Sequence, residues 1–277
     1  MVLGVLLLSV LFVGCAGTSP DDPPGSAEAL PTGLVGPVAP TVGPGALRYV
    51  AIGDGYTYGD GVQQADRWPN QLARILRPDL DIEVAANLSG RSTATHQIIS
   101  DQLPQLMQLR PQFVSVQVGA NDAIFGPTPP DTYAANVAKI LDAVLELVPA
   151  DRVVAVTTPD FTLIPYYAIL YEGTPVRARI QRFNQSLREA AAARGIAVVD
   201  ISPISERVPD DPSLVASDGK HPSGKQYAGW ADLVAERVRP LFATAPASPE
   251  ASEQPIVSAS QRTSVSPTGV PAASVSP

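Results

Sequence analysis

Short apolar segments alternate with longer amphipathic segments throughout residues 48–242, which is the pattern of an α/β protein. Five apolar runs are nearly continuous and indicate strands buried on both faces, at residues 48–53, 82–89, 113–119, 152–158 and 196–202. The intervening segments predict helices at residues 68–77, 93–110, 132–148, 176–194 and 223–242. This alternation predicts a five-stranded parallel sheet between two layers of helices, a three-layer α/β/α sandwich.

The N-terminal end differs from this pattern. Residues 2–13 form an apolar run that is too short to span a bilayer comfortably, and Gly14 and Cys15 follow it. A small residue before a cysteine at the end of such a run resembles a bacterial lipobox, in which the thiol receives a lipid. We therefore expect residues 1–15 to be a lipoprotein signal peptide, and the protein to be exported and anchored at the membrane or cell surface through Cys15. An uncleaved anchor with an ordinary buried cysteine is the alternative.

Residues 16–46 and 244–277 are rich in Pro, Ala, Gly and Ser and show no apolar periodicity. Such segments cannot bury enough apolar surface to offset the entropy of ordering, so we expect a flexible spacer and a disordered tail. Residues 47–243 then form one domain. The formal charge of −8 offers no basic surface for nucleic acid, and the single cysteine excludes an internal disulfide. We expect a monomer without a nucleic-acid partner.

Four short segments carry the candidate chemistry of the chain. Ligands of open parallel sheets bind outside the carboxyl ends of the strands, and three of the segments follow predicted strands directly. They are GDGYTYG at residues 53–59, NLSGRS at 87–92 and VGAND at 118–122. The fourth, SDGKHPSG at 217–224, precedes the last predicted helix. All four are therefore expected at one end of the sheet.

Each segment has a chemical interpretation and a structural one. Asp218 can hold one ring nitrogen of His221 and leave the other as a base, but the same turn could simply cap a helix. The Asn121 amide can donate to a developing oxyanion, or it can form an Asx turn. Gly90 offers an unobstructed backbone N–H, or it is only a turn residue. No segment decides between these alternatives alone.

Taken together, the four segments resemble the ordered blocks of the SGNH, or GDSL, hydrolases. The blocks stand here as Gly53-Asp54-Gly55-Tyr56-Thr57-Tyr58-Gly59, Gly90, Gly119-Ala120-Asn121-Asp122 and Asp218-Gly219-Lys220-His221-Pro222. The resemblance covers residues 48–242 and implies a flavodoxin-like fold without a cofactor or metal. It implies hydrolysis of acyl or acetyl esters of a lipid or glycan.

The resemblance also implies roles for individual residues. His221 would be the general base and Asp218 the carboxylate that orients it. Gly90, Asn121 and the backbone N–H of Gly55 would donate to the oxyanion. The family places its nucleophilic serine at the position of Gly55.

Glycine has no side chain, so the acyl-enzyme route is not available at residue 55. The Thr57 hydroxyl would have to move several ångströms to replace a serine there, and no spacing argument directs Ser89 or Ser92 at His221. We therefore predict that hydrolysis is weak or absent. The alternative is a non-catalytic protein that binds ligands on the same fold.

Gly53, Gly55 and Gly59 also resemble a glycine-rich dinucleotide-binding turn. Asp54 would place negative charge beside a phosphate, and the next helical pattern begins only near Trp68. Both features disfavour a dinucleotide site.

The remaining candidates have ordinary structural explanations. His96 lies in a polar helical stretch and is expected at the surface, and two separated histidines with one cysteine make no metal set. Tyr166, Tyr167 and Tyr171 follow the fourth predicted strand. They either line an apolar cleft or cap the edge of the sheet.

Overall fold

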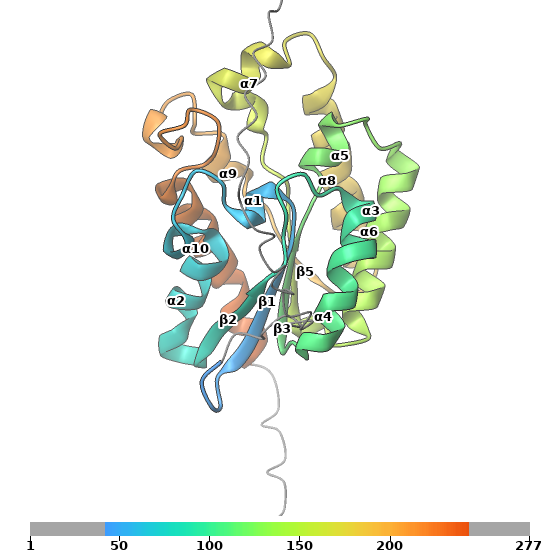
Figure 1. The fold of residues 1–277 in the computed structure, drawn as a ribbon, viewed down its shortest axis with the longest axis vertical. Coiled ribbons are helices and arrows are strands. Elements are labelled where there is room, and N and C mark those ends of the chain that lie inside the picture. The colour runs from blue at the N-terminus through green and yellow to red at the C-terminus, as the bar shows by residue number, and fades with distance from the viewer. Residues whose placement is uncertain (1–41, 244–277) are drawn as a thin grey trace, which may run out of the picture. The chain divides into compact units, whose positions relative to one another are not determined.

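The structure, a computed structural model, describes residues 42–243. Five parallel strands form one sheet in the order β2-β1-β3-β4-β5. Their bounds are β1 (Leu47–Gly53), β2 (Ile82–Asn87), β3 (Phe113–Gln117), β4 (Val153–Val156) and β5 (Ala197–Val199). Helices cover both faces of this sheet (Figure 1). The predicted three-layer parallel fold is confirmed.

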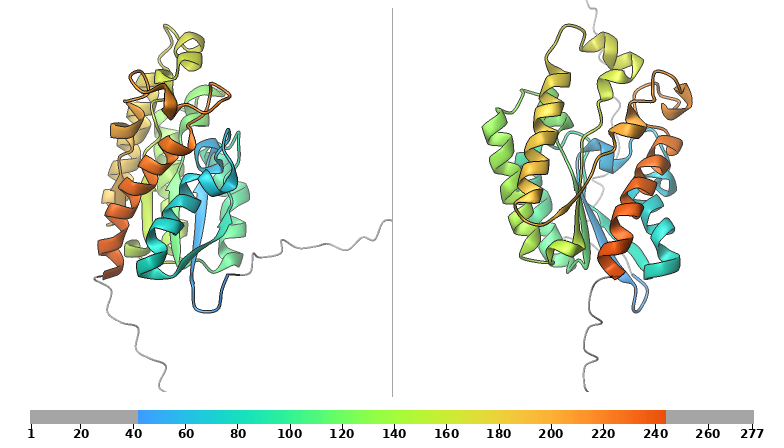
Figure 2. Two further views of the ribbon diagram at one scale, coloured as in Figure 1. Left: turned by 90° about the vertical axis from the view of Figure 1, so that its left-hand side faces the viewer. Right: turned by 180° about the vertical axis from the view of Figure 1, so that it is seen from behind.

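The longer helices occupy the predicted positions. They are α2 (Trp68–Leu80), α4 (Leu103–Leu109), α6 (Pro130–Leu145), α8 (Val176–Ala192) and α10 (Gly224–Ala243). Helices α2 and α10 pack together on one face of the sheet, while α6 and α8 pack together on the other (Figure 2). Trp68, Leu72 and Leu76 form the buried stripe of α2, because residues four apart lie on the same side of a helix.

The predicted helix at residues 93–110 is divided into three parts. It consists of α3 (Thr95–Gln97), a π-helical turn η2 (Ile98–Gln102) and α4, and it ends at Arg110 with φ +47°. The π-turn has a structural partner, because the buried Gln102 amide pairs with both backbone groups of Gly53. Its Oε1 accepts from the Gly53 N–H at 2.9 Å, and its Nε2 donates to the Gly53 carbonyl at 2.8 Å.

Short helical segments occupy most of the connections. They are α1 (Gly55–Tyr58), α5 (Ala120–Ile124), α7 (Pro165–Leu170), α9 (Ser202–Ser205), η1 (Gln64–Asp66), η3 (Ala150–Arg152), η4 (Phe161–Leu163) and η5 (Pro212–Leu214). The alternation of apolar residues did not reveal them, because each is about one turn long. Helices α1 and α5 begin directly after β1 and β3, at the end of the sheet where the candidate residues were expected.

The predicted signal peptide at residues 1–15 and the tail at 244–277 lie outside the described residues, as does most of the spacer at 16–46. The last five residues of that spacer form a turn that leads into β1. The Gly43 N–H donates to the Glu83 carboxylate at 3.1 Å, and Ala46 is buried. Gly43 and Ala46, which were expected to belong to the spacer, therefore pack against the domain. None of the helices between residues 42 and 243 has the length and apolar character needed to cross a membrane.

Candidate active site

The Asp54 carboxylate links the two backbone turns on which the candidate site is built. It is fully buried and caps α1 by accepting from the Tyr56 N–H at 3.0 Å. Its other oxygen accepts from the N–H groups of Gly119 and Ala120, both at 3.1 Å. Burial raises the pKa of Asp54 to about 7, although these three hydrogen bonds act in the opposite direction. One carboxylate therefore connects the turn after β1 to the turn after β3.

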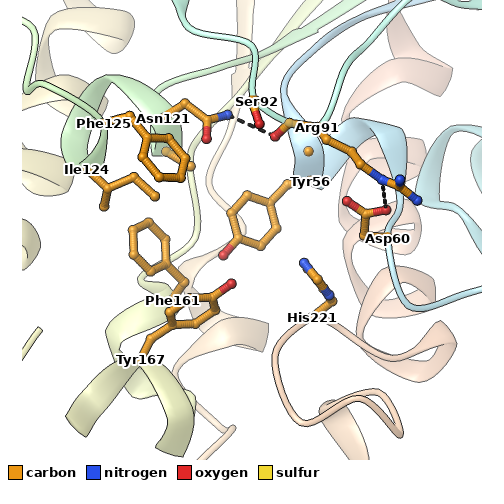
Figure 3. A pocket seen from close by; sticks show the side chains of 12 residues that line it. Tyr56, Asp60, Arg91, Ser92, Asn121, Ile124, Phe125, Phe161, Tyr167 and His221 are labelled. Atoms are coloured by element: carbon orange, nitrogen blue, oxygen red, sulfur yellow. Dashed lines mark hydrogen bonds and ion pairs between the residues drawn. The ribbon is translucent and has the colours of Figure 1, made fainter. Parts of the chain in front are cut away.

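A cavity of about 230 Å³ opens above these turns, where the sheet order changes direction between β1 and β3. Figure 3 shows its lining side chains. The lining residues are Gly55, Tyr56, Asp60, Arg91, Ser92, Ala120, Asn121, Ile124, Phe125, Phe161, Tyr167 and His221. The structure thus brings Gly55, Asn121 and His221 together from three separate parts of the chain.

His221 is paired with Asp218, as its spacing suggested. The two side chains meet through His221 Nδ1 and Asp218 Oδ2 at 2.6 Å. The other carboxylate oxygen of Asp218 accepts from the backbone N–H groups of Lys220 at 2.8 Å and His221 at 3.1 Å. Partial burial works against ionisation, but these hydrogen bonds outweigh it and lower the pKa of the Asp218 carboxyl. Asp218 therefore fixes the imidazole while His221 lines the cavity.

Gly61 supports this pair and was not identified from the sequence. It has φ +81°, and a Cβ there would lie 2.9 Å from Asp218 Oδ2 and 3.1 Å from His221 Cβ. A side chain at residue 61 would therefore push the two apart as well as strain the backbone. In the sequence, the only indication of this supporting role was the presence of a glycine shortly after the block at residues 53–59.

The predicted oxyanion donors are largely engaged within the protein. Asn121 Nδ2 donates to the carbonyl oxygens of Arg91 at 3.2 Å and Thr93 at 2.9 Å. Gly90 is not a lining residue, and its N–H donates to the Gly53 carbonyl at 3.4 Å. The expectation that Gly90 presents an open donor to the cavity is therefore not met in this structure, because its N–H points toward the end of β1.

Gly55 retains the third predicted donor. It is the first residue of α1, and its N–H makes no hydrogen bond to any residue between 42 and 243. A Cβ at residue 55 would lie 3.0 Å from the Arg91 carbonyl oxygen. The turn after β2 therefore lies closer to residue 55 than backbone atoms usually lie to a Cβ.

The other hydroxyl groups near Gly55 differ in their access to the cavity. Thr57 is fully buried and donates to Gln117 Oε1 at 3.0 Å. The Ser89 hydroxyl donates to the Asn87 side chain. Ser92 is exposed and lines the cavity. Thr57 and Ser89 are therefore held by structural hydrogen bonds, and of these three hydroxyls Ser92 is the one that faces the cavity.

Aromatic rings form one wall of the cavity. Phe161 stacks against Tyr56 with ring centroids 6.0 Å apart and meets Tyr167 edge-on at 5.5 Å. Tyr171 stacks behind Tyr167 at 5.9 Å, and the Tyr166 ring lies under the Lys220 ammonium at 4.5 Å. Of the three tyrosines in this segment, Tyr167 therefore lines the cleft, and the other two support or surround it.

His96 is exposed, as expected. Among residues 42–243, no group of three or more His, Cys, Asp or Glu side chains is arranged to hold a metal ion.

Comparison with known families agrees with this arrangement. The sequence model of the GDSL-like lipase/acylhydrolase family matches residues 51–229, a span that begins in β1 and ends in α10. The chain belongs to this family. Its members are ester hydrolases, and the matched region contains all four of the sequence blocks that resembled them. A search of the curated proteins found no match.

Solved structures of similar fold include an esterase and a lipase/acylhydrolase. An acetylxylan esterase from Geobacillus stearothermophilus has 17% identity and a TM-score of 0.56, with 70% of this chain and 94% of that one covered. A lipase/acylhydrolase from Enterococcus faecalis has 20% identity and a TM-score of 0.55, with coverages of 69% and 95%. An α/β hydrolase from the metagenome of Lake Arreo, Spain, has 17% identity and a TM-score of 0.56, with coverages of 70% and 96%. At these identities the likeness establishes the fold.

Proposed function

We propose that this member of the family binds an acyl or acetyl ester in the cavity and hydrolyses it very slowly or not at all. The observation that carries the proposal is the position of the Arg91 carbonyl. It lies 3.0 Å from where a Cβ of residue 55 would stand, and it accepts a hydrogen bond from Asn121. A structural neighbour that is named an acetylxylan esterase supports an ester as the ligand class.

The family reaction needs a nucleophile, a base and donors for an oxyanion. His221, with Asp218 behind it, can serve as the base. Gly55 supplies no nucleophile, and the Asn121 amide already has two carbonyl partners. A carbonyl oxygen beside the reaction centre also disfavours a developing oxyanion, because the oxygen is the negative end of the peptide dipole. The chain therefore keeps the base, the cavity and the Gly55 N–H donor, but it lacks the nucleophile and a free Asn121 amide.

A slow reaction with water remains chemically accessible. His221 can remove a proton from a water molecule that attacks the ester carbonyl, while the free Gly55 N–H donates to the oxygen. In a serine protease without its triad, binding and oxyanion donors alone retain roughly a thousandfold acceleration over water. We expect turnover of the present chain to stay at or below that order.

A ligand titration tests the proposal directly. Phenyl acetate added to the ¹⁵N-labelled protein should shift the backbone signals of Tyr56 and His221 and the side-chain amide signals of Asn121. Release of phenol should exceed the rate without protein by no more than about a thousandfold. Signals that do not move, or that move only at distant residues, would contradict ester binding in this cavity.

We also propose that the protein is an exported lipoprotein attached through Cys15. The support is the apolar run at residues 2–13 and the small residue before the cysteine. Fatty-acid labelling of the cells tests this attachment.

A further inference from the structure

The Tyr56 hydroxyl is a polar group without a protein partner. Only 8% of this side chain is exposed, and its ring is held by Phe161 at 6.0 Å and by Trp230 at 6.2 Å. The hydroxyl makes no hydrogen bond with any residue from 42 to 243, and Figure 3 shows it pointing into the cavity. A hydroxyl that faces a cavity without a partner in the protein is available to hydrogen-bond a ligand.

The Tyr167 hydroxyl faces the same space. Figure 3 shows the Tyr56 and Tyr167 hydroxyls directed toward one another across the cavity, and Tyr167 also has no hydrogen-bond partner in the described part of the chain. Burial raises the pKa of both phenols, most strongly for Tyr56. Both groups therefore stay neutral near pH 7, and each can donate as well as accept a hydrogen bond.

A pair of charged residues lies on the opposite side of the cavity. Asp60 Oδ1 accepts from Arg91 Nε at 2.6 Å. Within residues 42–243, the second Asp60 oxygen and the two terminal nitrogens of Arg91 make no further hydrogen bond. The Arg91 guanidinium is oriented by the Tyr58 ring, whose centroid is 5.1 Å away. An acceptor and two donors thus stand side by side, which suits neighbouring hydroxyl groups of a ligand.

We propose that the Tyr56 and Tyr167 hydroxyls and the Asp60 carboxylate bind hydroxyl groups on the alcohol part of the ester. The ligand is then an ester of a polyhydroxylated ring, such as an acylated sugar. This inference rests on the proposed function, since it names the ligand class of the same cavity.

The apolar wall fits the same ligand. Ile124, Phe125 and Phe161 line the side of the cavity opposite Asp60 and Arg91 (Figure 3), and 64% of Phe125 is exposed at the rim. A sugar ring has C–H faces that pack on such rings and hydroxyls that reach polar groups around its edge. A fatty acyl chain in this space would instead cover polar side chains without giving them partners, which is unfavourable.

Two matched esters test the inference on the protein as it exists. Methyl 6-O-acetyl-glucopyranoside and cyclohexylmethyl acetate share a six-membered ring and an acetyl ester, but only the first carries hydroxyls. We expect the sugar ester to bind at least tenfold more tightly in an NMR titration. Tyr56→Phe should weaken its binding about fivefold while the affinity for cyclohexylmethyl acetate changes less than twofold. Tyr166→Phe, which removes a hydroxyl outside the cavity lining, should change neither affinity.

The outcomes separate this inference from the proposed function. Equal binding of the two esters, or a Tyr56→Phe effect that is the same for both, would overturn the role of the hydroxyls while leaving ester binding intact. Tighter binding of the cyclohexyl ester would favour a lipid ligand and also overturn the inference. Failure of both esters to bind would overturn the proposed function itself.

Discussion

The carbonyl oxygen of Arg91 stands 3.0 Å from the position that a Cβ of Gly55 would take. Few real Cβ atoms have so close a contact, so the turn after β2 is adapted to a residue without a side chain. The same oxygen accepts from Asn121, which joins this turn to the start of α5. The carbonyl oxygen of Arg91 therefore lies beside the residue that lacks the nucleophile and also occupies one of the expected oxyanion donors.

Gly55→Ser should restore esterase activity. The new hydroxyl would stand at the mouth of the cavity that His221 lines, although the Arg91 turn must first move by a few tenths of an ångström. We expect hydrolysis of p-nitrophenyl acetate to rise by about a thousandfold or more, and a fluorophosphonate to label residue 55.

Gly55→Ala is the matched control, because it adds the same Cβ without a hydroxyl. It should remain as inactive as the parent, and His221→Ala should remove the gain in the Gly55→Ser protein. A folded Gly55→Ser protein that neither hydrolyses the ester nor takes the label would show that this cavity cannot support acyl transfer.

Gly61→Ala should separate Asp218 from His221. The substitution adds a contact of 2.9 Å to Asp218 Oδ2 and places a non-glycine residue at φ +81°. We expect a loss of about 1–3 kcal/mol in the free energy of unfolding and the disappearance of the downfield NMR signal of the hydrogen-bonded His221 Nδ1 proton. Gly173→Ala is the control, since φ is +68° there with nothing within 4 Å of the added Cβ. It should strain the backbone and leave that signal in place.

The sequence was sufficient for the strands and for the positions of most candidate residues. Apolar runs mark β1 and β3, and the polar blocks that follow them lie at the carboxyl ends of these strands because a parallel sheet gathers those ends together. The Asp218–His221 contact was also accessible, because the two residues share one turn.

Other features depend on tertiary contacts that no local pattern encodes. The π-turn at Ile98–Gln102 brings the Gln102 amide to Gly53, which is 49 residues earlier. The Arg91 carbonyl belongs to the backbone, so its direction follows from the conformation of the turn and not from the residue type. Asp60 pairs with Arg91 across 31 residues, and neither was identified as a candidate residue from the sequence. The geometry that disfavours catalysis was therefore visible only in the structure.

Cys15→Ala should abolish lipid attachment. If the predicted signal at residues 1–15 is processed as a lipoprotein signal, cells that are fed a radioactive fatty acid will label the parent protein. The variant should carry no label and should appear in the soluble fraction. Label that persists on the variant would contradict attachment through this cysteine, and a variant with Gly14 intact and Ser9→Ala provides a control within the same segment.

Asp54→Asn should change how stability depends on pH. The ordinary pKa of an aspartate is 3.8, whereas burial raises that of Asp54 to about 7 in the folded protein. Between these values the folded state holds a proton that the unfolded chain has released, so unfolding releases a proton. The contribution of Asp54 to stability is therefore complete below pH 4 and is lost as the pH rises to about 7. From pH 5 to pH 8 this amounts to roughly 3 kcal/mol.

An asparagine at residue 54 cannot titrate, so its protein should lack this slope in urea denaturation at pH 5, 6, 7 and 8. It should also be less stable than the parent throughout, because one amide oxygen replaces a carboxylate that accepts from Tyr56, Gly119 and Ala120. The amide nitrogen must then face at least one backbone N–H, which costs about 1–3 kcal/mol.

Asp232→Asn, on the outer side of α10, should leave both the slope and the stability unchanged. A parent protein whose stability is flat or rises over this range would show that Asp54 is ionised in the fold, and that its three N–H donors outweigh the loss of hydration.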